Sequence, residues 1–230
     1  MKIMKAIRTK KDFVEKCGFD PFTKDFVKEH VITCLRPVTK SETDLTYSCM
    51  DLEAYFRVRI DKDMSYVITK EMLDILDLTG KDLITAGFNN SFKDVSFMSL
   101  EETMGNILFQ KNNKEDDDKN IVSFTEEVAR EFEKCPEEPK VLTNKEMNYG
   151  AGLITNLLIL RIIGNIYEKD FFIIPSSVHE VIIMPVGFGM SISEIKEMII
   201  SINKGSVSLE DKLSDNLYFY FRETEQVVQI

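Results

Sequence analysis

Residues 171–185 read FFIIPSSVHEVIIMP, which is two apolar, β-branched runs separated by a short polar segment. Runs of this length and composition are typical of buried β-strands. The segment between them, residues 175–180, contains a proline and two serines, which favour turns. The stretch therefore predicts a β-hairpin. Because the strands of a hairpin run antiparallel, it argues against a purely parallel sheet.

A second hairpin is predicted upstream of the first. Residues 54–60 alternate well enough for a strand, residues 61–63 favour a turn, and residues 64–68 return as the second strand. Three isolated strands are also predicted, and the last of them closes the chain. They cover residues 30–35, 140–143 and 217–221.

Capping signals locate the helices between these strands. Thr69, Thr79 and Ser99 each precede an apolar run, and the last two have an acidic residue three positions further on, as in a capping box. The longest helix is predicted over residues 148–167, where apolar residues recur at helical spacing. Further helices are predicted over residues 10–17, 23–30, 123–133 and 193–203.

Two hairpin regions with helices around them predict an α+β fold, with a mostly antiparallel sheet covered by helices. Four segments follow from the pattern: a basic helical arm (residues 1–30), a hairpin with helices (31–110), an acidic flexible loop (111–120) and a strand–helix–hairpin–helix–strand unit (121–230). We expect the last unit to form one continuous domain with residues 31–110.

The composition narrows the class of protein. The chain has 230 residues, of which 43% are hydrophobic and 30% charged, as in globular proteins. Its net charge of −10 argues against direct nucleic-acid binding, which needs a basic surface. No run is apolar and long enough to span a membrane. Four cysteines without metal-site spacing and the absence of a signal peptide predict reduced thiols in the cytoplasm.

Charge is distributed unevenly along the chain. Residues 1–40 contain ten Lys and Arg and five Asp and Glu, a net charge of +5, so the remaining residues carry −15. Two interpretations stay open for this basic arm. It contacts an acidic partner, or it lies on the acidic body of its own chain.

The turn at residues 175–180 contains the side chains best suited to catalysis. Ser176 or Ser177 with His179 could supply a nucleophile and a base, and Glu180 is adjacent. The alternative is that these side chains fix the turn by hydrogen bonds to the backbone. Neighbouring residues of a strand face opposite sides, so we expect one of His179 and Glu180 to be buried. His179 shares its parity with Val181, which predicts that His179 faces inward.

Other candidate residues suggest binding more than catalysis. Asn144 follows a predicted strand and Gly150 opens a helix, so free amides there could meet an anion, although close helix–sheet packing explains the glycine equally. The candidate binding residues are Asn144, His179, Glu180 and Asn203. With two histidines and no glycine-rich phosphate loop, no metal site and no cofactor are predicted.

Several of these motifs occur together in a known family. The strand end at residues 141–144 is followed by Gly150-Ala151, then by the block at residues 172–185, Glu197-Met198, Asn203, Leu213-Ser-Asp215 and Tyr218. Asp51-Leu52, Tyr55 and Ile68-Thr69 fit upstream. The set resembles an uncharacterised family of clostridial and related bacteria, the domain of unknown function with index five-six-eight-eight, over about residues 30–230.

The resemblance implies a bacterial, cytosolic setting, often in genomes rich in mobile elements, and it implies no activity. The family typically has a longer amino-terminal region, which is replaced here by about thirty residues. Because the sequence shows no nucleophile triad, no metal set and no nucleotide loop, and because an acidic body with a basic arm suits a protein partner, we predict a non-enzymatic protein-binding or regulatory domain, with a protein or protein–nucleic-acid complex as its partner. One version is a mobile-element protein that blocks a host nucleic-acid-handling complex, such as a defence nuclease. The alternative is a hydrolase-like enzyme that uses Ser176, His179 and Glu180.

Overall fold

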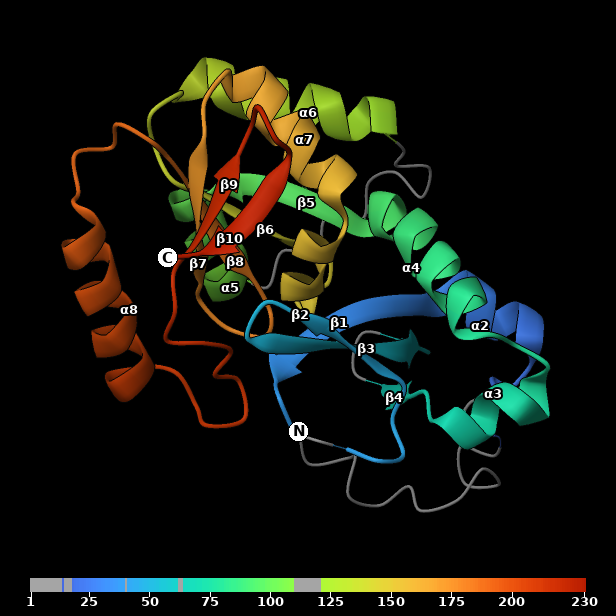
Figure 1. The fold of residues 1–230 in the computed structure, drawn as a ribbon. Coiled ribbons are helices and arrows are strands. Elements are labelled where there is room, and N and C mark those ends of the chain that lie inside the picture. The colour runs from blue at the N-terminus through green and yellow to red at the C-terminus, as the bar shows by residue number, and fades with distance from the viewer. Residues whose placement is uncertain (1–13, 15–17, 40, 62–63, 110–120) are drawn as a thin grey trace.

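A computed structural model describes residues 14, 18–39, 41–61, 64–109 and 121–230. Two of the predicted features, the helix over residues 10–17 and the flexible loop over residues 111–120, lie wholly or mostly outside the described residues. The described parts form two antiparallel sheets with helices packed around them (Figure 1). The predicted α+β class is confirmed, and the two hairpin regions belong to separate sheets.

The smaller sheet has four strands and is centred on β3. This strand pairs with β1 along one side, and along the other it pairs first with β2 and then with β4. The hairpin predicted upstream is present as β3 and β4, whereas β2 was not predicted, because its polar TYSC sequence carries no apolar alternation. The strands are β1 (Val31–Pro37), β2 (Thr46–Cys49), β3 (Leu52–Arg59) and β4 (Ser65–Val67).

The larger sheet has six strands in the order β10-β9-β7-β8-β6-β5. The stretch that opened the sequence analysis forms β7 and β8, with Ile173 opposite Ile183. The strand predicted over residues 217–221 is present as β9, but the expectation that it is the last strand was wrong, because the chain turns after β9 and returns as β10. The strands are β5 (Val95–Ser99), β6 (Lys140–Asn144), β7 (Phe171–Pro175), β8 (Val181–Pro185), β9 (Tyr218–Phe221) and β10 (Gln226–Gln229).

The capping predictions for the helices hold. The hydroxyls of Thr69 and Thr79 accept first-turn amide hydrogens, and Thr79 forms a full capping box with Asp82. Ser99 likewise accepts the N–H of Glu102. The helices are α2 (Lys24–His30), α3 (Lys70–Leu76), α4 (Gly80–Asp94), α5 (Leu100–Phe109), α6 (Ile121–Lys134), α7 (Leu157–Tyr167) and α8 (Ile192–Gly205).

The single long helix predicted over residues 148–167 was wrong. A 3-10 helix, η1 (Gly150–Thr155), ends at Asn156, whose side chain caps α7 as a separate helix. Close packing explains the break. A Cβ atom on Gly152 would lie 1.9 Å from the carbonyl oxygen of Thr33, so η1 is pressed against β1.

The two faces of the six-stranded sheet have different covers. Helices α6 and α7 pack on the inner face, where they share the largest apolar core with strands of both sheets. Helix α8 packs on the outer face through Ile195 and Ile199 and stands apart from the other helices in Figure 1. Helices α2 to α4 lie beside the four-stranded sheet. No helix among the described residues combines the length and apolarity needed to cross a membrane.

Candidate functional site

The turn between β7 and β8 is held by its own side chains. The hydroxyl of Ser177 donates to the Glu180 carboxylate (2.8 Å) and accepts the backbone N–H of His179 (3.0 Å). The carbonyl oxygen of His179 accepts a bond from the Thr143 hydroxyl (2.8 Å), which ties the turn to the end of β6. Ser177 is therefore engaged with Glu180 and not with the imidazole ring.

Both ring nitrogens of His179 are also occupied. The backbone N–H of Tyr149 donates to Nδ1 (3.2 Å), so Nδ1 is an acceptor and the proton sits on Nε2. Nε2 lies 3.2 Å from Asp211 Oδ1 and donates to it. A general base must keep one nitrogen free to face its nucleophile. This imidazole instead joins the turn to two other segments of the chain.

The burial predicted for the turn was wrong in part. The His179 side chain is 29% exposed and Glu180 is also half-buried, so neither is the fully inward residue. The physical reason is local geometry. Residues 176–180 lie outside β7 and β8, so the alternation of strand faces does not apply to them.

The two asparagines predicted as binding residues are buried in different places. Asn144 donates to the carbonyl oxygen of Asn148 (2.7 Å) and accepts the N–H of the same residue, which closes the loop after β6. Asn203, on α8, donates to the carbonyl oxygen of Ser214 and to the Asp215 carboxylate. The structure therefore brings Asn144 near the turn and leaves Asn203 on the outer side of the sheet.

Tyr149 was not singled out by its sequence, although it connects several polar groups. Its backbone has a φ of 59°, which is rare for a residue with a side chain. Its ring lies 5.6 Å from the His179 ring and covers the Arg57 guanidinium at 4.5 Å. Arg57 is buried and donates to the Ser65 hydroxyl (3.0 Å). The side chains of Tyr149 and Arg57 therefore contact other groups of the protein.

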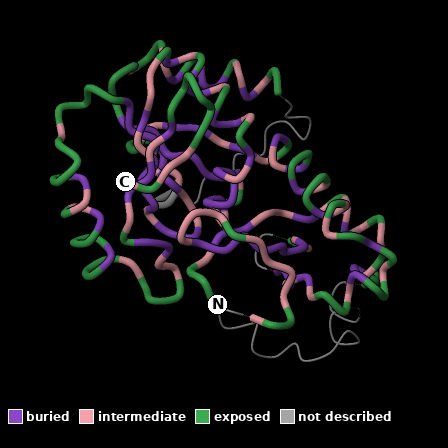
Figure 2. The backbone as a smooth tube through the Cα atoms, in the orientation of Figure 1, coloured by how far each residue is buried: buried purple, intermediate pink, exposed green. Residues whose placement is uncertain are grey.

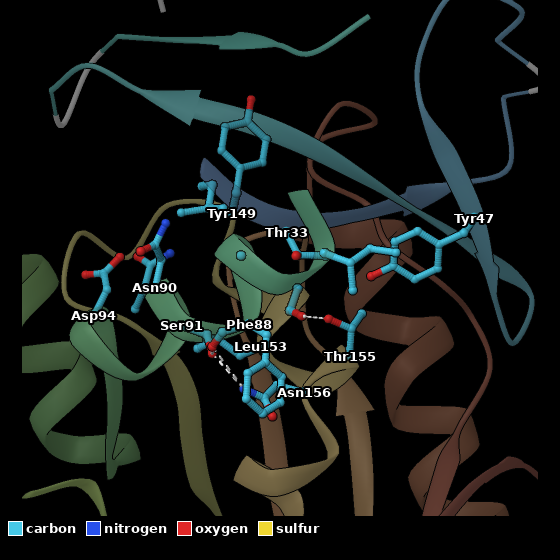
Figure 3. Close-up of a pocket in the computed structure, with 15 residues that line it drawn as sticks. Thr33, Tyr47, Phe88, Asn90, Ser91, Asp94, Tyr149, Leu153, Thr155 and Asn156 are labelled. Carbon is cyan, nitrogen blue, oxygen red and sulfur yellow. Dashed lines mark hydrogen bonds between the residues drawn. The ribbon is translucent and has the colours of Figure 1, made fainter. Parts of the chain in front are cut away.

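A small pocket lies between the two sheets, with polar side chains on several elements around it (Figure 3). The Asn156 amide donates to Ser91 (2.7 Å), and the Asn90 amide donates to two backbone carbonyls. Asp94 is paired with Arg59. The cavity measures about 70 Å³, whereas small-molecule sites occupy roughly 300–1,000 Å³. This pocket has room for a few water molecules and not for a metabolite.

The described cysteines are poor nucleophiles. Burial raises the pKa of Cys34 to about 12 and also raises the pKa of Cys49. A hydrogen bond with Glu138, ahead of a smaller effect of desolvation, raises the pKa of Cys135. A thiolate is the reactive form, so these thiols stay protonated near neutral pH. The same part of the chain contains no cluster of histidines, cysteines and carboxylates that could hold a metal ion.

A different kind of site appears on the outer face of the six-stranded sheet. Phe172 of β7 lies opposite Phe219 of β9, and Val228 of β10 lies opposite Phe219 on the other side. Phe221 and Val186 lie one row further on, at the end of the sheet away from α8. The ring centroids are 5.0 Å apart for Phe172 and Phe219 and 4.8 Å apart for Phe219 and Phe221. We call these five residues the aromatic strip.

Exposure increases along the aromatic strip as it leaves α8. On β9, Leu217 lies beneath α8 and is fully buried, Phe219 is half-buried and Phe221 is 40% exposed. Val186 is 41% exposed at the same end. The aromatic strip could have been predicted in part from the sequence, because the period-two spacing of Phe219 and Phe221 places both rings on one face of a strand.

Comparison with known proteins gives one positive result. The sequence model of a family of unknown function, DUF5688, matches residues 25–222. The chain belongs to this family. No curated protein and no solved structure matches it. The resemblance noted from the motifs is thus confirmed, and DUF5688 membership assigns no activity to the chain.

In this DUF5688 chain, the motif residues that carried the resemblance mostly join segments together. Asp51 accepts hydrogen bonds from Ser214, Asn216 and Tyr218, which fastens the start of β9 to the four-stranded sheet. Gly150 lies where a Cβ atom would be 2.5 Å from the carbonyl oxygen of His179. These residues specify the fold, and the aromatic strip lies outside them except for Phe172.

Proposed function

We propose that this chain is a non-enzymatic bacterial domain that acts by binding another protein in the cytoplasm. The observation that carries the proposal is the aromatic strip. Aromatic side chains are enriched at protein interfaces, where they bury a large area with little loss of conformational freedom. Three phenylalanines in contact, open at one end of a sheet face, match this chemistry.

The polar sites support the proposal by what they are used for. The ring of His179 already has partners in two other segments, the hydroxyl of Ser177 has a partner in the turn, and the polar pocket of about 70 Å³ between the sheets is too small for a metabolite. A hydrolase using Ser176, His179 and Glu180 would need this turn to open. Nothing in the hydrogen bonding of the described residues favours that change.

The overall charge narrows the partner. A net charge of −10 favours association with a basic surface and speeds encounter with it at low ionic strength. Proteins that handle nucleic acids present such surfaces. A mobile-element protein that covers the basic surface of a host nuclease, and so blocks it, is the specific version of the proposal.

The test is affinity capture with matched variants. The full chain is immobilised, exposed to lysate of its host bacterium and crosslinked, and the captured proteins are identified by mass spectrometry. The double variant Phe221→Thr/Val186→Thr shortens the aromatic strip and keeps β-branched side chains in its place. The control is Leu209→Thr, because Leu209 is 93% exposed and lies outside the strip.

We expect one or a few proteins to be captured by the wild type and the control and to be lost with the double variant. Equal capture by all three proteins would contradict the proposal. So would turnover of an ester, phosphate or peptide substrate that disappears in His179→Ala. If the captured protein is a nuclease, its cleavage of DNA or RNA should slow when the wild type is added.

A further inference from the structure

Strand β10 is the outermost strand at one edge of the six-stranded sheet. The N–H of Ile230 donates to the carbonyl oxygen of Leu217, so residues 226, 228 and 230 face β9. Val227 and Gln229 therefore direct their N–H and C=O groups away from the sheet. In the part of the chain that the structure describes, no strand pairs with this side of β10.

The edge of β10 lies beside the aromatic strip. Val228, Phe219 and Phe172 form one row across three neighbouring strands. A strand added to β10 would extend this row by one residue, since cross-strand partners share a face of the sheet. Backbone pairing and an apolar contact would then come from the same extended segment.

This edge has few of the features that usually prevent strand addition. Edge strands are commonly protected by lysine, by proline or by a bulge. Residues 226–230 read QVVQI and contain neither lysine nor proline, and β10 pairs with β9 in unbroken register. Figure 2 shows the β9–β10 turn as exposed.

The charge of the residues near this edge and of the whole chain indicates which kind of segment could bind here. Glu223 and Glu225 are exposed in the turn between β9 and β10, and Asp170 lies at the same end of the sheet. Arg222 is the only basic residue of residues 222–225. Glu225 pairs with Arg161 at 3.5 Å, whereas no salt bridge to Glu223 is found within the described ranges. These five residues carry three negative charges and two positive ones, a net charge of −1, and the whole chain carries −10.

We infer that β10 is an addition site for an extended segment of a basic protein, with apolar residues at alternate positions and lysine or arginine between them. The apolar side chains would extend the row formed by Val228 and Phe219, and the basic residues would face an acidic chain, with Glu223 exposed in the turn beside β10. This inference rests on the proposed function and adds its mode of binding. Strand addition of this kind obtains affinity from the backbone and specificity from alternate side chains.

The probe is a synthetic, amidated peptide of alternating Phe or Val and Lys, labelled for fluorescence anisotropy against the full chain. One comparison peptide has Glu in place of Lys. A second has the same side chains with alternate backbone amides methylated, which removes edge donors. Hydrogen exchange is measured on the peptide complex, because the amides of Val227 and Gln229 should gain protection while that of Val228 is already bonded to β9.

The matched protein variants are Gln229→Pro and Gln229→Thr. Proline removes only an outward N–H and is tolerated at sheet edges, whereas threonine keeps the donor. We expect Gln229→Pro to weaken binding by about tenfold, since one backbone hydrogen bond is lost, and Gln229→Thr to bind like the wild type. The methylated peptide and the Glu peptide should both bind more weakly than the Lys peptide.

Each other outcome overturns the inference in a distinct way. If capture of the cellular partner depends on Phe221 and not on Gln229, the partner uses the face of the sheet and strand addition is wrong. If neither residue matters, the proposed function fails as well. If the chain alone dimerises by light scattering and Gln229→Pro makes it monomeric, the occupant is a second copy. Equal binding of the Lys and Glu peptides would exclude a basic partner.

Discussion

The turn at residues 176–180 and the β9–β10 hairpin belong to the same sheet but differ in how far their groups are used within the chain. The turn contains serine, histidine and glutamate, and the Ser177 hydroxyl, the Glu180 carboxylate and both ring nitrogens of His179 have partners within the chain. The hairpin contains no serine, histidine or cysteine, and Phe221 and one row of its backbone groups remain open. Reactive side chains here build structure, and ordinary apolar ones are left for contact.

This difference shows how to rank candidate residues in a chain without a known activity. A histidine with both nitrogens bonded has little freedom to move a proton. Exposing a row of phenylalanine rings to water is unfavourable, and the free energy falls when a partner covers them. What separates the two regions is therefore whether their groups already have contacts within the chain, and not the type of residue. Four substitutions test the contrast, and they are taken from the largest expected effect to the smallest.

Gly150→Ala should be the most destabilising. A Cβ atom at this position would lie 2.5 Å from both the His179 carbonyl oxygen and the Thr143 hydroxyl, and 2.7 Å from the Asn144 nitrogen. Because two of these are backbone atoms, the turn and β6 would have to separate. We expect a loss of about 3 kcal/mol in the free energy of unfolding, measured with urea.

The control for Gly150→Ala is Gly105→Ala. Gly105 lies in α5, and nothing lies within 4 Å of an added Cβ atom there. Alanine favours helix, so this variant should be slightly more stable, by roughly 0.5–1 kcal/mol. If both variants unfold at the same urea concentration as the wild type, the turn is not packed as tightly as the structure indicates.

Asp51→Asn should have the next largest effect, and its size should depend on pH. Burial alone would raise the pKa of Asp51, but hydrogen bonds from Tyr218, Asn216 and Ser214 hold it below its ordinary value. A carboxyl with a lowered folded pKa stabilises the fold above its unfolded pKa of about 3.9 and loses that contribution as pH falls.

The expected loss for Asp51→Asn is about 2 kcal/mol at pH 7, because a charge-assisted acceptor is replaced by a neutral one. At pH 3 the difference between the wild type and the variant should narrow. Chemical denaturation at both pH values measures it. A difference that is the same at pH 3 and pH 7 would show that the carboxylate charge does not hold β9 in place.

Much of the scaffold was predictable because its signals are local. Apolar alternation indicated β7 and β8, and the spacing of Thr79 and Asp82 indicated the start of α4. The break at Asn156 was not predictable, because it depends on Gly152 meeting the Thr33 backbone more than a hundred residues away in sequence. Strand β2 was missed since its pairing with β3, and not its composition, makes it a strand.

The candidate site was less predictable than the fold. Sequence reasoning selected His179 by residue type and could not see that Tyr149 and Asp211 occupy its ring. The aromatic strip depends on which strands are neighbours. Phe172 and Phe219 are 47 positions apart and become adjacent only through the pairing of β7 with β9.

His179→Ala should have a modest effect that separates scaffold from catalysis. Its loss leaves the Tyr149 N–H and the Asp211 carboxylate without their partner, and the ring is 29% exposed, so water replaces part of the bonding. We expect a loss of about 1 kcal/mol, which corresponds to a fall of roughly 2–4 °C in Tm for a domain of this size.

The control for His179→Ala is Asp211→Asn, which keeps an acceptor oxygen for the Nε2 proton and should lower Tm less. Thermal melts of the three proteins are sufficient. If His179→Ala overlays the wild type, the imidazole is not part of the framework, and the turn regains interest as a functional surface.

Phe221→Thr should have the smallest effect on stability and the largest on binding. The ring is 40% exposed and contacts Phe219 at 4.8 Å, and threonine retains the preference for a strand. Cross-strand aromatic contacts contribute roughly 0.2–1 kcal/mol, so the free energy of unfolding should fall by about 0.5 kcal/mol. Capture of the cellular partner should nevertheless be lost, because a ring at the open end of the aromatic strip is where a partner would bury most new surface. A variant that unfolds early and still captures its partner would reverse the contrast between the two regions, since the hairpin would then be the scaffold.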